Sequence, residues 1–489
     1  MTILFTPFTK VFKLDSEQLK FYNRWLLISA VLIFIAALCS TGFHHFDEQW
    51  QIFEFLGLKL GKTSKELLPW EYHNQMRSWA QPFLYYLSSK ALFLENPFWI
   101  ALVSRLVTAF IGWYALGCLS ICSMYLYRDF DKAKWATYCL SLFWFIPYLK
   151  VRPSSEGLSA SVFIIGLSLL ITQLESRKYN YSSLFISGLV CGLSFLFRFQ
   201  MGFLILFTWI WLVLFSTIPF KKSFLFALGV CFAVAIELPI DIWGYETFSF
   251  APWNYFYQNL VLDKASGFPT APWYDYFISS FHRGIPPLSI VLIITQVLFW
   301  IFKPKSIFTW ATLPLFIVHS LIPAKASRYL FPLAVITPLF IPWAHTFLVE
   351  KLRVYRKFVG PKFIKAIIAI NLILLTQSIL RSSKSTVGLY KYVYDQSIKE
   401  VHYKGESPYS MVGLELMFYR QKGLELRELP DFKTNLEQKY LISKKGKEIF
   451  ELKDKGCELK YSNYPTWVLN YNAFGWVDRS RIWSLFYCP

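Results

Sequence analysis

The sequence is poor in charge for its length. Asp, Glu, Lys and Arg make up only 17% of the 489 residues, whereas 55% are hydrophobic and 20% are aromatic. The apolar residues lie in long runs such as residues 203–218 (FLILFTWIWLVLFSTI), close to the roughly 20 residues that a helix needs to cross a bilayer. This composition excludes an ordinary soluble globular protein and predicts a chain that crosses a membrane several times.

Cysteine pairs with metal-ligand spacing are also absent. Six of the eight cysteines lie in or near apolar segments, where the thiol behaves as a small core side chain. Cys457 and Cys488 lie in the C-terminal segment and could pair in an oxidising compartment. The cysteines therefore support no zinc site. We also expect no other metal and no cofactor.

A cleavable signal peptide, an internal repeat and a low-complexity linker are lacking as well. The first apolar run begins near residue 26 and no small-residue cleavage site follows it, so we interpret it as a retained first span. About eleven spans are expected, near residues 26–43, 98–127, 134–149, 157–174, 183–197, 200–218, 223–240, 286–302, 307–321, 329–349 and 363–381.

The net charge of +19 fits membrane orientation better than nucleic-acid binding. Lys and Arg precede the first span and cluster in alternate later loops, ending with a cluster at residues 351–365. With eleven spans these clusters share one side, which the positive-inside rule makes cytoplasmic. The N-terminus is then cytoplasmic and the C-terminus external, and no nucleic-acid partner is predicted.

Two long external loops and a polar tail follow from this topology. The loops are 44–96 and 241–285, both rich in aromatics, and Trp50–Leu60 is expected to form a helix lying in the membrane interface. From residue 382 Lys, Glu and Tyr become frequent, and residues 439–443 have the character of a strand. We predict a transmembrane domain over 1–381, including both loops, and a small external mixed α/β domain over 382–489.

The sharpest local pattern is HHFDEQWQ at residues 44–51, with Glu54 one turn further on. Acidic side chains at the mouth of a span are costly to desolvate and require a partner or a task. A carboxylate here could be a general base that takes a proton from an attacking hydroxyl. Alternatively, Asp47 and Glu48 form a solvated cap after a helix, and the pattern alone leaves both interpretations open.

A resemblance favours the first interpretation. Residues 45–82 resemble the first lumenal loop of glycosyltransferase family 22, the polyprenyl-phosphate-mannose-dependent mannosyltransferases of the GPI-anchor and N-glycan pathways. Phe46 stands where that loop usually has Pro. The matches in order are Asp47-Glu48, Gln51, Glu54, Trp70-Glu71-Tyr72, Arg77-Ser78 and Pro82.

Three further stretches are similar to the same family. They are residues 241–259 (DIWGYETFSFAPWNYFYQN), 267–277 (GFPTAPWYDYF) and 319–332 (HSLIPAKASRYLFP). The order of Gly244-Tyr245 is reversed, and Ala271 replaces a usual His. Ala324 and Ala326 replace a second His and a Glu, while Lys325 and Arg328 remain.

The resemblance implies a GT-C fold, an all-α polytopic bundle with its active site on the non-cytoplasmic side. The donor would be a polyprenyl-phosphate sugar, the acceptor a glycan or glycolipid, and the anomeric centre would be inverted. Asp47 would be the catalytic base and Glu48 its neighbour. No metal is obligatory if cationic side chains hold the donor phosphate.

Four cations in external turns break the positive-inside pattern: Lys325, Arg328, Arg198 and Arg152. Charge-assisted hydrogen bonds from such groups would stabilise the phosphate of a leaving lipid. The alternative is that these side chains extend to lipid headgroups. Phosphate binding is favoured for Lys325 and Arg328, whereas the two interpretations are equally favoured for Arg152 and Arg198.

Eight residues are candidates for substrate contact: Gln51, Glu54, Trp70, Glu71, Arg77, Trp253, Trp273 and His319. For several of them a purely structural role is the alternative. Glu71 and Arg77 could pair with each other, Trp253 and Trp273 could belong to the interfacial belt, and His319 could be a packed core residue.

The sequence thus predicts a membrane α-mannosyltransferase with a polyprenyl-phosphate donor, or a close relative that moves another hexose or a pentose. A transporter or flippase for a lipid-linked sugar is the alternative from another class, although the paired halves typical of transporters are not seen. A catalytically silent subunit is a third. A bacterial inner membrane and an endoplasmic reticulum membrane both fit the expected topology.

Overall fold

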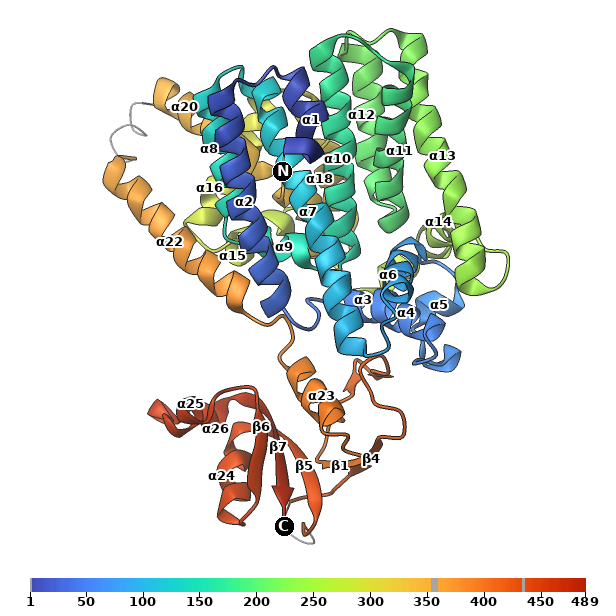
Figure 1. Ribbon diagram of the computed structural model, residues 1–489, viewed down its shortest axis with the longest axis vertical. Helices are drawn as coiled ribbons and strands as arrows, with labels where there is room; N and C mark the ends of the chain where they lie inside the picture. The colour runs from blue at the N-terminus through green and yellow to red at the C-terminus, as the bar shows by residue number, and fades with distance from the viewer. Residues whose placement is uncertain (1, 353–358, 433–435) are drawn as a thin grey trace. The chain divides into compact units, whose positions relative to one another are not determined.

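The computed structural model describes residues 2–352, 359–432 and 436–489 (Figure 1). The chain forms two compact units. The helical unit comprises Met1–Cys39, Asn74–Leu84 and Ser104–Arg381, and the mixed unit comprises Ser40–His73, Tyr85–Val103 and Ser382–Pro489. Three basic residues of the expected cytoplasmic cluster, Arg353, Arg356 and Lys357, lie outside the described residues.

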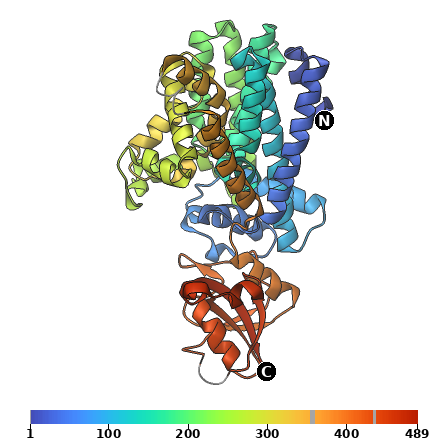
Figure 2. The same cartoon turned by 90° about the vertical axis from the view of Figure 1, so that its left-hand side faces the viewer.

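Long apolar helices dominate the helical unit and run side by side (Figures 1 and 2). Within the described residues, five are long and apolar enough to cross a membrane: α2 (Ser16–Cys39), α7 (Pro97–Tyr127), α10 (Ser155–Ser176), α13 (Phe220–Tyr245) and α22 (Pro361–Leu380). Two helix pairs bent by 114° and 44° raise this number to as many as seven. Two shorter apolar helices are α11 (Tyr181–Phe197) and α12 (Met201–Phe215).

The first bent pair joins α16 (Leu288–Phe302) to α17 (Ile307–Trp310) and α18 (Leu313–Leu321). The second joins η5 (Ser327–Leu330) and α19 (Phe331–Ala334) to η6 (Thr337–Phe340) and α20 (Ile341–Lys351). The other helices that lie in this unit are α1 (Thr2–Val11), α8 (Phe130–Leu142), α9 (Ile146–Val151), α14 (Ala251–Phe256), η3 (Tyr257–Val261), η4 (Lys264–Gly267) and α15 (Asp275–Arg283). The multi-spanning helical character is confirmed, and the count of eleven spans stays a prediction.

The expected span at 134–149 is not one continuous helix. α8 ends at Leu142, and α9 begins at Ile146 with Pro147 in its first turn, a position that suits proline. The break leaves backbone groups that need partners. Asn371 of α22 supplies them, donating to the Leu142 carbonyl at 2.7 Å and accepting from the Trp144 N–H at 3.0 Å.

Small residues let the helices of this unit approach closely. A Cβ added at Gly188 of α11 would overlap the backbone carbonyl of Phe226 in α13, and one at Gly244 would overlap the Trp79 ring. Such close approach maximises dispersion contacts, which associate helices where no hydrophobic effect acts between them.

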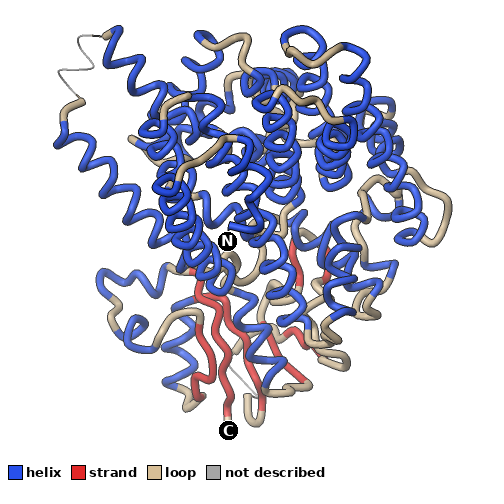
Figure 3. Tube along the Cα trace, turned by 45° about the horizontal axis from the view of Figure 1, so that its top comes forward, coloured by secondary structure: helices blue, strands red, loops and turns tan. Residues whose placement is uncertain are grey.

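The mixed unit contains a five-stranded sheet in the order β4-β1-β5-β7-β6 (Figure 3). β1 pairs in parallel with β4 and β5, whereas β7 pairs antiparallel with β5 and β6. The strands are β1 (Glu400–Tyr403), β2 (Ser410–Met411), β3 (Leu414–Glu415), β4 (Glu425–Glu428), β5 (Lys439–Lys445), β6 (Glu458–Ser462) and β7 (Arg481–Cys488). β5 confirms the strand expected at 439–443.

Helices complete the mixed unit and its core. Those nearest the N-terminus are α3 (Phe46–Glu48), η1 (Gln49–Phe53), α4 (Glu54–Lys59), η2 (Lys65–Leu67) and α5 (Trp70–His73), and α6 (Ala80–Ala91) runs from one unit into the other. Those of the C-terminal segment are α23 (Thr386–Asp395), α24 (Gly446–Asp454), α25 (Thr466–Asn470), η7 (Ala473–Gly475) and α26 (Trp476–Arg479). The small mixed α/β domain expected in the C-terminal segment is therefore confirmed in its mixed architecture, while its external position and the boundaries drawn at 381 and 382 stay predictions.

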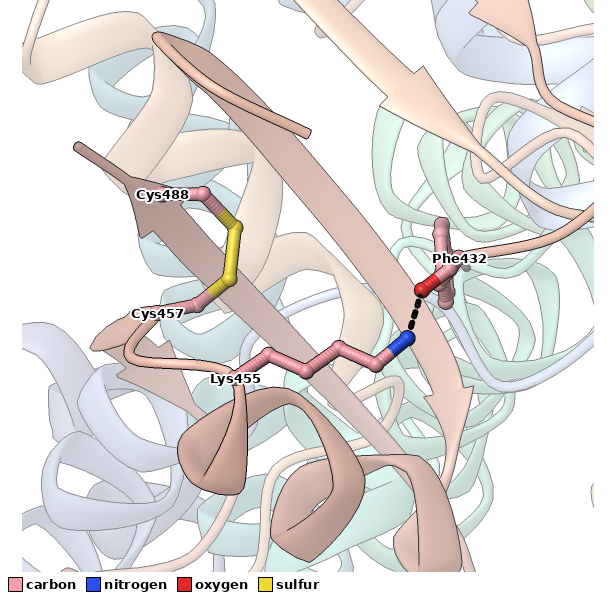
Figure 4. The surroundings of a disulfide bond; sticks show 4 residues. All are labelled: Phe432, Lys455, Cys457 and Cys488. Carbon is pink, nitrogen blue, oxygen red and sulfur yellow. Dashed lines mark hydrogen bonds between the residues drawn. A yellow bond between two sulfur atoms is a disulfide. The ribbon is translucent and has the colours of Figure 1, made fainter. Parts of the chain in front are cut away.

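A disulfide closes one side of this domain. Cys457 and Cys488, whose pairing the sequence left open, are bonded and join the residue before β6 to the end of β7 (Figure 4). Nearby, the Lys455 ammonium donates to the backbone carbonyl of Phe432. The bond fixes the last residues of the chain, which would otherwise fray.

The segment Trp50–Leu60 is helical as expected, but the prediction that its apolar face lies in the membrane interface is wrong. Residues 49–59 are helical, but Trp50, Phe53 and Leu56 are buried inside the mixed unit. Phe53 packs against Phe418, with ring centroids 5.1 Å apart. Periodicity shows that a helix has an apolar face but not whether lipid or protein covers it.

Candidate active site

The acidic segment begins with one short helical turn, α3. The backbone N–H of Asp47 donates to Nδ1 of His45, the N-cap residue, at 3.3 Å. Oδ1 of Asp47 lies 3.4 Å from the same nitrogen. The Asp47 side chain retains 20% exposure, so its carboxylate reaches the surface of its unit.

The other two acids of the segment are buried. Glu48 is 2% exposed, and its Oε2 accepts from the His44 N–H at 3.0 Å. Glu54 is 0% exposed and accepts from Gln49 Nε2 at 2.9 Å and from Thr63 Oγ1 at 2.6 Å. Of the three carboxylates, that of Asp47 is therefore the accessible one.

Glu54 has a structural role in the mixed unit. Besides the two side-chain donors, it accepts from the backbone N–H groups of Met417 at 3.1 Å and Phe418 at 3.1 Å. It thus ties the acidic segment to a stretch more than 350 residues later. Burial raises the pKa of Glu54 above its usual 4.5, and the hydrogen bonds from Thr63, Gln49 and the two backbone groups oppose that rise.

This shift predicts a pH dependence of stability. The folded pKa of Glu54 exceeds the unfolded one, so the folded state binds the extra proton between the two values. The free energy of unfolding should therefore fall as the pH rises from about 4.5 through the raised pKa. Glu54→Gln, which cannot ionise, should remove that part of the slope in thermal unfolding measured from pH 4 to 8.

Glu451→Gln is the matched control for this prediction, because Glu451 is an exposed glutamate of the same unit. Its slope should equal that of the wild type. An unchanged slope in Glu54→Gln would show that Glu54 does not titrate in this range.

Gln51 and Glu71 lie together in the mixed unit. Nε2 of Gln51 donates to Oε1 of Glu71 at 3.1 Å, which links η1 to α5. Trp70, the residue before Glu71, is 38% exposed. The pairing of Glu71 with Arg77 stays a prediction.

Arg77 lies in the helical unit, on the segment that precedes α6. The Tyr245 hydroxyl donates to its carbonyl at 2.7 Å and accepts from its N–H at 3.2 Å. The guanidinium lies over the Tyr255 ring, 5.4 Å from the centroid, a cation–π geometry. Asp241 supports the same segment by accepting from the Trp79 N–H at 3.2 Å and the Ala251 N–H at 2.9 Å.

A buried ionic cluster forms in the helical unit where α10 begins. Oε1 of Glu156, in the first turn of α10, forms ion pairs with Arg328 Nε at 3.0 Å and with Arg198 Nη2 at 3.3 Å. Both guanidinium groups lie over the Tyr329 ring, 5.4 and 5.3 Å from its centroid. Arg198 also donates to Ser155 Oγ at 3.3 Å. We call Glu156, Arg198, Arg328 and Tyr329 the arginine cluster.

The sequence predicted two of these residues, Arg198 and Arg328, but missed Glu156 and Tyr329. A signal for Glu156 was present, because an acidic residue at the start of an apolar run needs a cationic partner. One carboxylate between two guanidinium groups leaves the cluster with a formal charge of +1, which suits an anionic ligand.

Lys325 and His319 lie at the end of α18 in the same unit. The Lys325 ammonium donates to the backbone carbonyls of Ile322 at 2.6 Å and Ser320 at 3.0 Å, so it caps the C-terminal end of α18. Burial lowers the pKa of Lys325, and Asp275 opposes that shift. His319 is buried with Nδ1 3.0 Å from the Leu315 carbonyl, as expected for a packed histidine.

The remaining candidates differ in exposure. Arg152 is 1% exposed and lies over the Tyr148 ring at 5.8 Å, at the end of α9. Trp253 and Trp273 are 59% and 62% exposed. Among the described residues, no three or more His, Cys, Asp or Glu side chains are grouped so that they could hold a metal ion.

The fold is that of a GT-C type membrane glycosyltransferase. The structure resembles ArnT from Cupriavidus metallidurans bound to undecaprenyl phosphate, with a TM-score of 0.54 over 94% of this chain and 97% of that one, at 11% identity. It also resembles the oligosaccharyltransferase of Archaeoglobus fulgidus, with a TM-score of 0.51, 12% identity and coverage of 86% and 68%. At these identities the likeness concerns the fold alone.

Residues 24–409 match the Alg9-like mannosyltransferase family, and the chain belongs to that family. GPI mannosyltransferase 3 of Candida albicans is 25% identical over 341 residues, 68% of this chain and 64% of the relative. GPI alpha-1,2-mannosyltransferase 3 of Xenopus laevis is 24% identical over 336 residues, 65% and 59%. The chain thus spans less than two thirds of the length of these relatives.

Proposed function

We propose that the protein transfers a mannosyl group from a polyprenyl-phosphate mannose to a hydroxyl group of a glycolipid or other glycan acceptor. Family membership supports the sugar, and the names of the relatives support a glycolipid acceptor. The observation that carries the proposal is the accessibility of Asp47 in an acidic segment whose other two carboxylates are buried.

In the proposed reaction, the acceptor oxygen attacks the anomeric carbon as the bond from that carbon to the phosphate oxygen breaks. Asp47 takes the proton of the acceptor hydroxyl, and polyprenyl phosphate leaves with the bonding electron pair. Attack opposite the leaving group inverts the anomeric centre, so a β-linked phosphate donor gives an α-mannoside. His45, whose Nδ1 accepts from the Asp47 N–H, would fix the backbone of the turn that carries the base.

The arginine cluster is the proposed phosphate site. Arg198 and Arg328 are held in fixed positions by Glu156 and Tyr329, so they need little reorganisation when charge develops on the leaving phosphate. Lys325 and Arg152 would add positive charge from neighbouring turns. Trp70, Gln51 and Arg77 remain proposed substrate contacts, as do Trp273 and His319.

The proposed topology puts the N-terminus in the cytoplasm and the active site on the external face of an endoplasmic reticulum or bacterial inner membrane. The lipid-linked donor would reach the site within the bilayer.

The test is mannosyl transfer by the purified full-length protein in liposomes. Radiolabelled polyprenyl-phosphate mannose is the donor, a pooled glycolipid extract the acceptor, and the product is digested with α- and β-mannosidase. We expect a product released by α-mannosidase, in amounts that chelator does not reduce. A product with another labelled polyprenyl-phosphate sugar instead would change the proposed sugar. Failure of every such donor would contradict the proposal.

A further inference from the structure

The short helix formed by α14 and η3, residues 251–261, has its apolar side outward. Trp253, Phe256, Tyr257, Leu260 and Val261 are 59%, 45%, 40%, 66% and 56% exposed. In a helix at a water-exposed surface these residues would turn inward instead. We call these five residues the outer stripe.

The inward side of the same helix is polar. Asn254 Nδ2 donates to the Gln75 carbonyl at 3.0 Å, and the Tyr255 hydroxyl accepts from Gln200 Nε2 at 2.7 Å. The Tyr255 ring also faces the Arg77 guanidinium. The helix therefore has a polar face that is hydrogen-bonded to the protein and an apolar face that is exposed, the opposite of a helix on a water-exposed surface.

We infer that the outer stripe is a bilayer-contacting surface, and that the helix lies in the boundary between lipid headgroups and acyl chains. Its position in the chain supports lipid as the occupant. The apolar helix α13, which exposes Leu228 and Phe232, ends at Tyr245, and five residues separate it from the start of α14 at Ala251. The six residue-to-residue steps from Tyr245 to Ala251 reach at most about 22 Å, so α14 lies near the end of α13.

The composition of the stripe fits the same boundary. Trp and Tyr favour the headgroup level, while Phe, Leu and Val favour the acyl side. Charged residues return directly after the helix, at Asp263 and Lys264, which are exposed. A lipid-bound stripe would therefore hold the inner face, and with it the Arg77 segment and the turn at Gln200, at a fixed depth in the membrane.

The test is labelling of the full-length protein in liposomes by a phospholipid with a photoactivatable group in its acyl chain. Labelled residues are then mapped by mass spectrometry. We expect the outer stripe to carry about tenfold more label than Asn254 and Tyr255, since only the outer side contacts acyl chains. Leu228 and Phe232 provide the positive control. An unlabelled stripe beside labelled Leu228 and Phe232 would overturn the inference.

Two further arms sharpen the result. Leu260→Glu should reduce labelling of residues 251–261 several-fold. Ser266→Glu, a matched change at an exposed polar position, should leave this labelling unchanged. Equal labelling of the two variants would contradict the inference. Loss of label on adding polyprenyl phosphate would identify the occupant as a polyprenyl chain and overturn the assignment to bilayer lipid. The labelling needs no turnover, so it is independent of the proposed mannosyl transfer.

Discussion

Asp47→Asn is expected to lower kcat for mannosyl transfer by about 10²–10⁴-fold, the usual contribution of a positioned general base. Asn has nearly the shape of Asp but cannot accept the proton of the acceptor hydroxyl at neutral pH. The backbone hydrogen bond from residue 47 to His45 Nδ1 does not involve the side chain, so the α3 turn should persist. The thermal midpoint should therefore stay close to that of the wild type.

The measurement is single-turnover transfer in liposomes with saturating donor, which reports the chemical step. Asp454→Asn is the matched control, since Asp454 is an exposed aspartate of the same unit, and it should leave the rate unchanged. Glu48→Gln gives a second comparison, because its buried carboxylate accepts from the His44 N–H and its loss should lower stability. Equal rates for Asp47→Asn and the wild type would remove Asp47 from the catalytic role.

The second large effect is expected for Glu156→Gln, which removes the negative charge from the arginine cluster. Arg198 and Arg328 both contact Oε1 of Glu156, and Arg198 is buried. Breaking a buried ion pair by removing one partner typically costs about 3–5 kcal/mol, because the remaining charge is left without compensation. We therefore expect a clear fall in the thermal midpoint of the variant.

Glu175→Gln is the matched control on the same helix. Glu175 pairs with Arg128, whose side chain is 60% exposed, and such surface pairs contribute about 0–1 kcal/mol. Unfolding is followed in detergent by scanning fluorimetry. Equal midpoints for the two variants would show that the cluster does not carry the expected stability.

Adding polyprenyl phosphate to Glu156→Gln separates phosphate binding from a purely structural role. A phosphate bound beside Arg198 and Arg328 would replace part of the missing negative charge and raise the midpoint by mass action. The rise should be larger in the variant than in the wild type. No rise in either protein would contradict the assignment of the cluster as the phosphate site.

Some structural features could be predicted from the sequence, and others could not. The strand at 439–443 was foreseen because it depends on local pattern, whereas the sequence named the bond between Cys457 and Cys488 only as one that could form. The segment Trp50–Leu60 was correctly predicted to be helical, but it was wrongly predicted to lie in the membrane interface. Its apolar face packs within the mixed unit against Phe418, a contact across more than 350 residues of chain.

The sequence by itself determined that the protein is a polytopic membrane protein of the Alg9-like mannosyltransferase family, because apolar run length and ordered motifs are written along the chain. Only the tertiary structure decided which acids of one motif are buried, and which carboxylate holds Arg198 and Arg328. Burial and ion pairing depend on side chains brought together from distant segments. No local pattern encodes which partner a charge will meet or what will cover an apolar face.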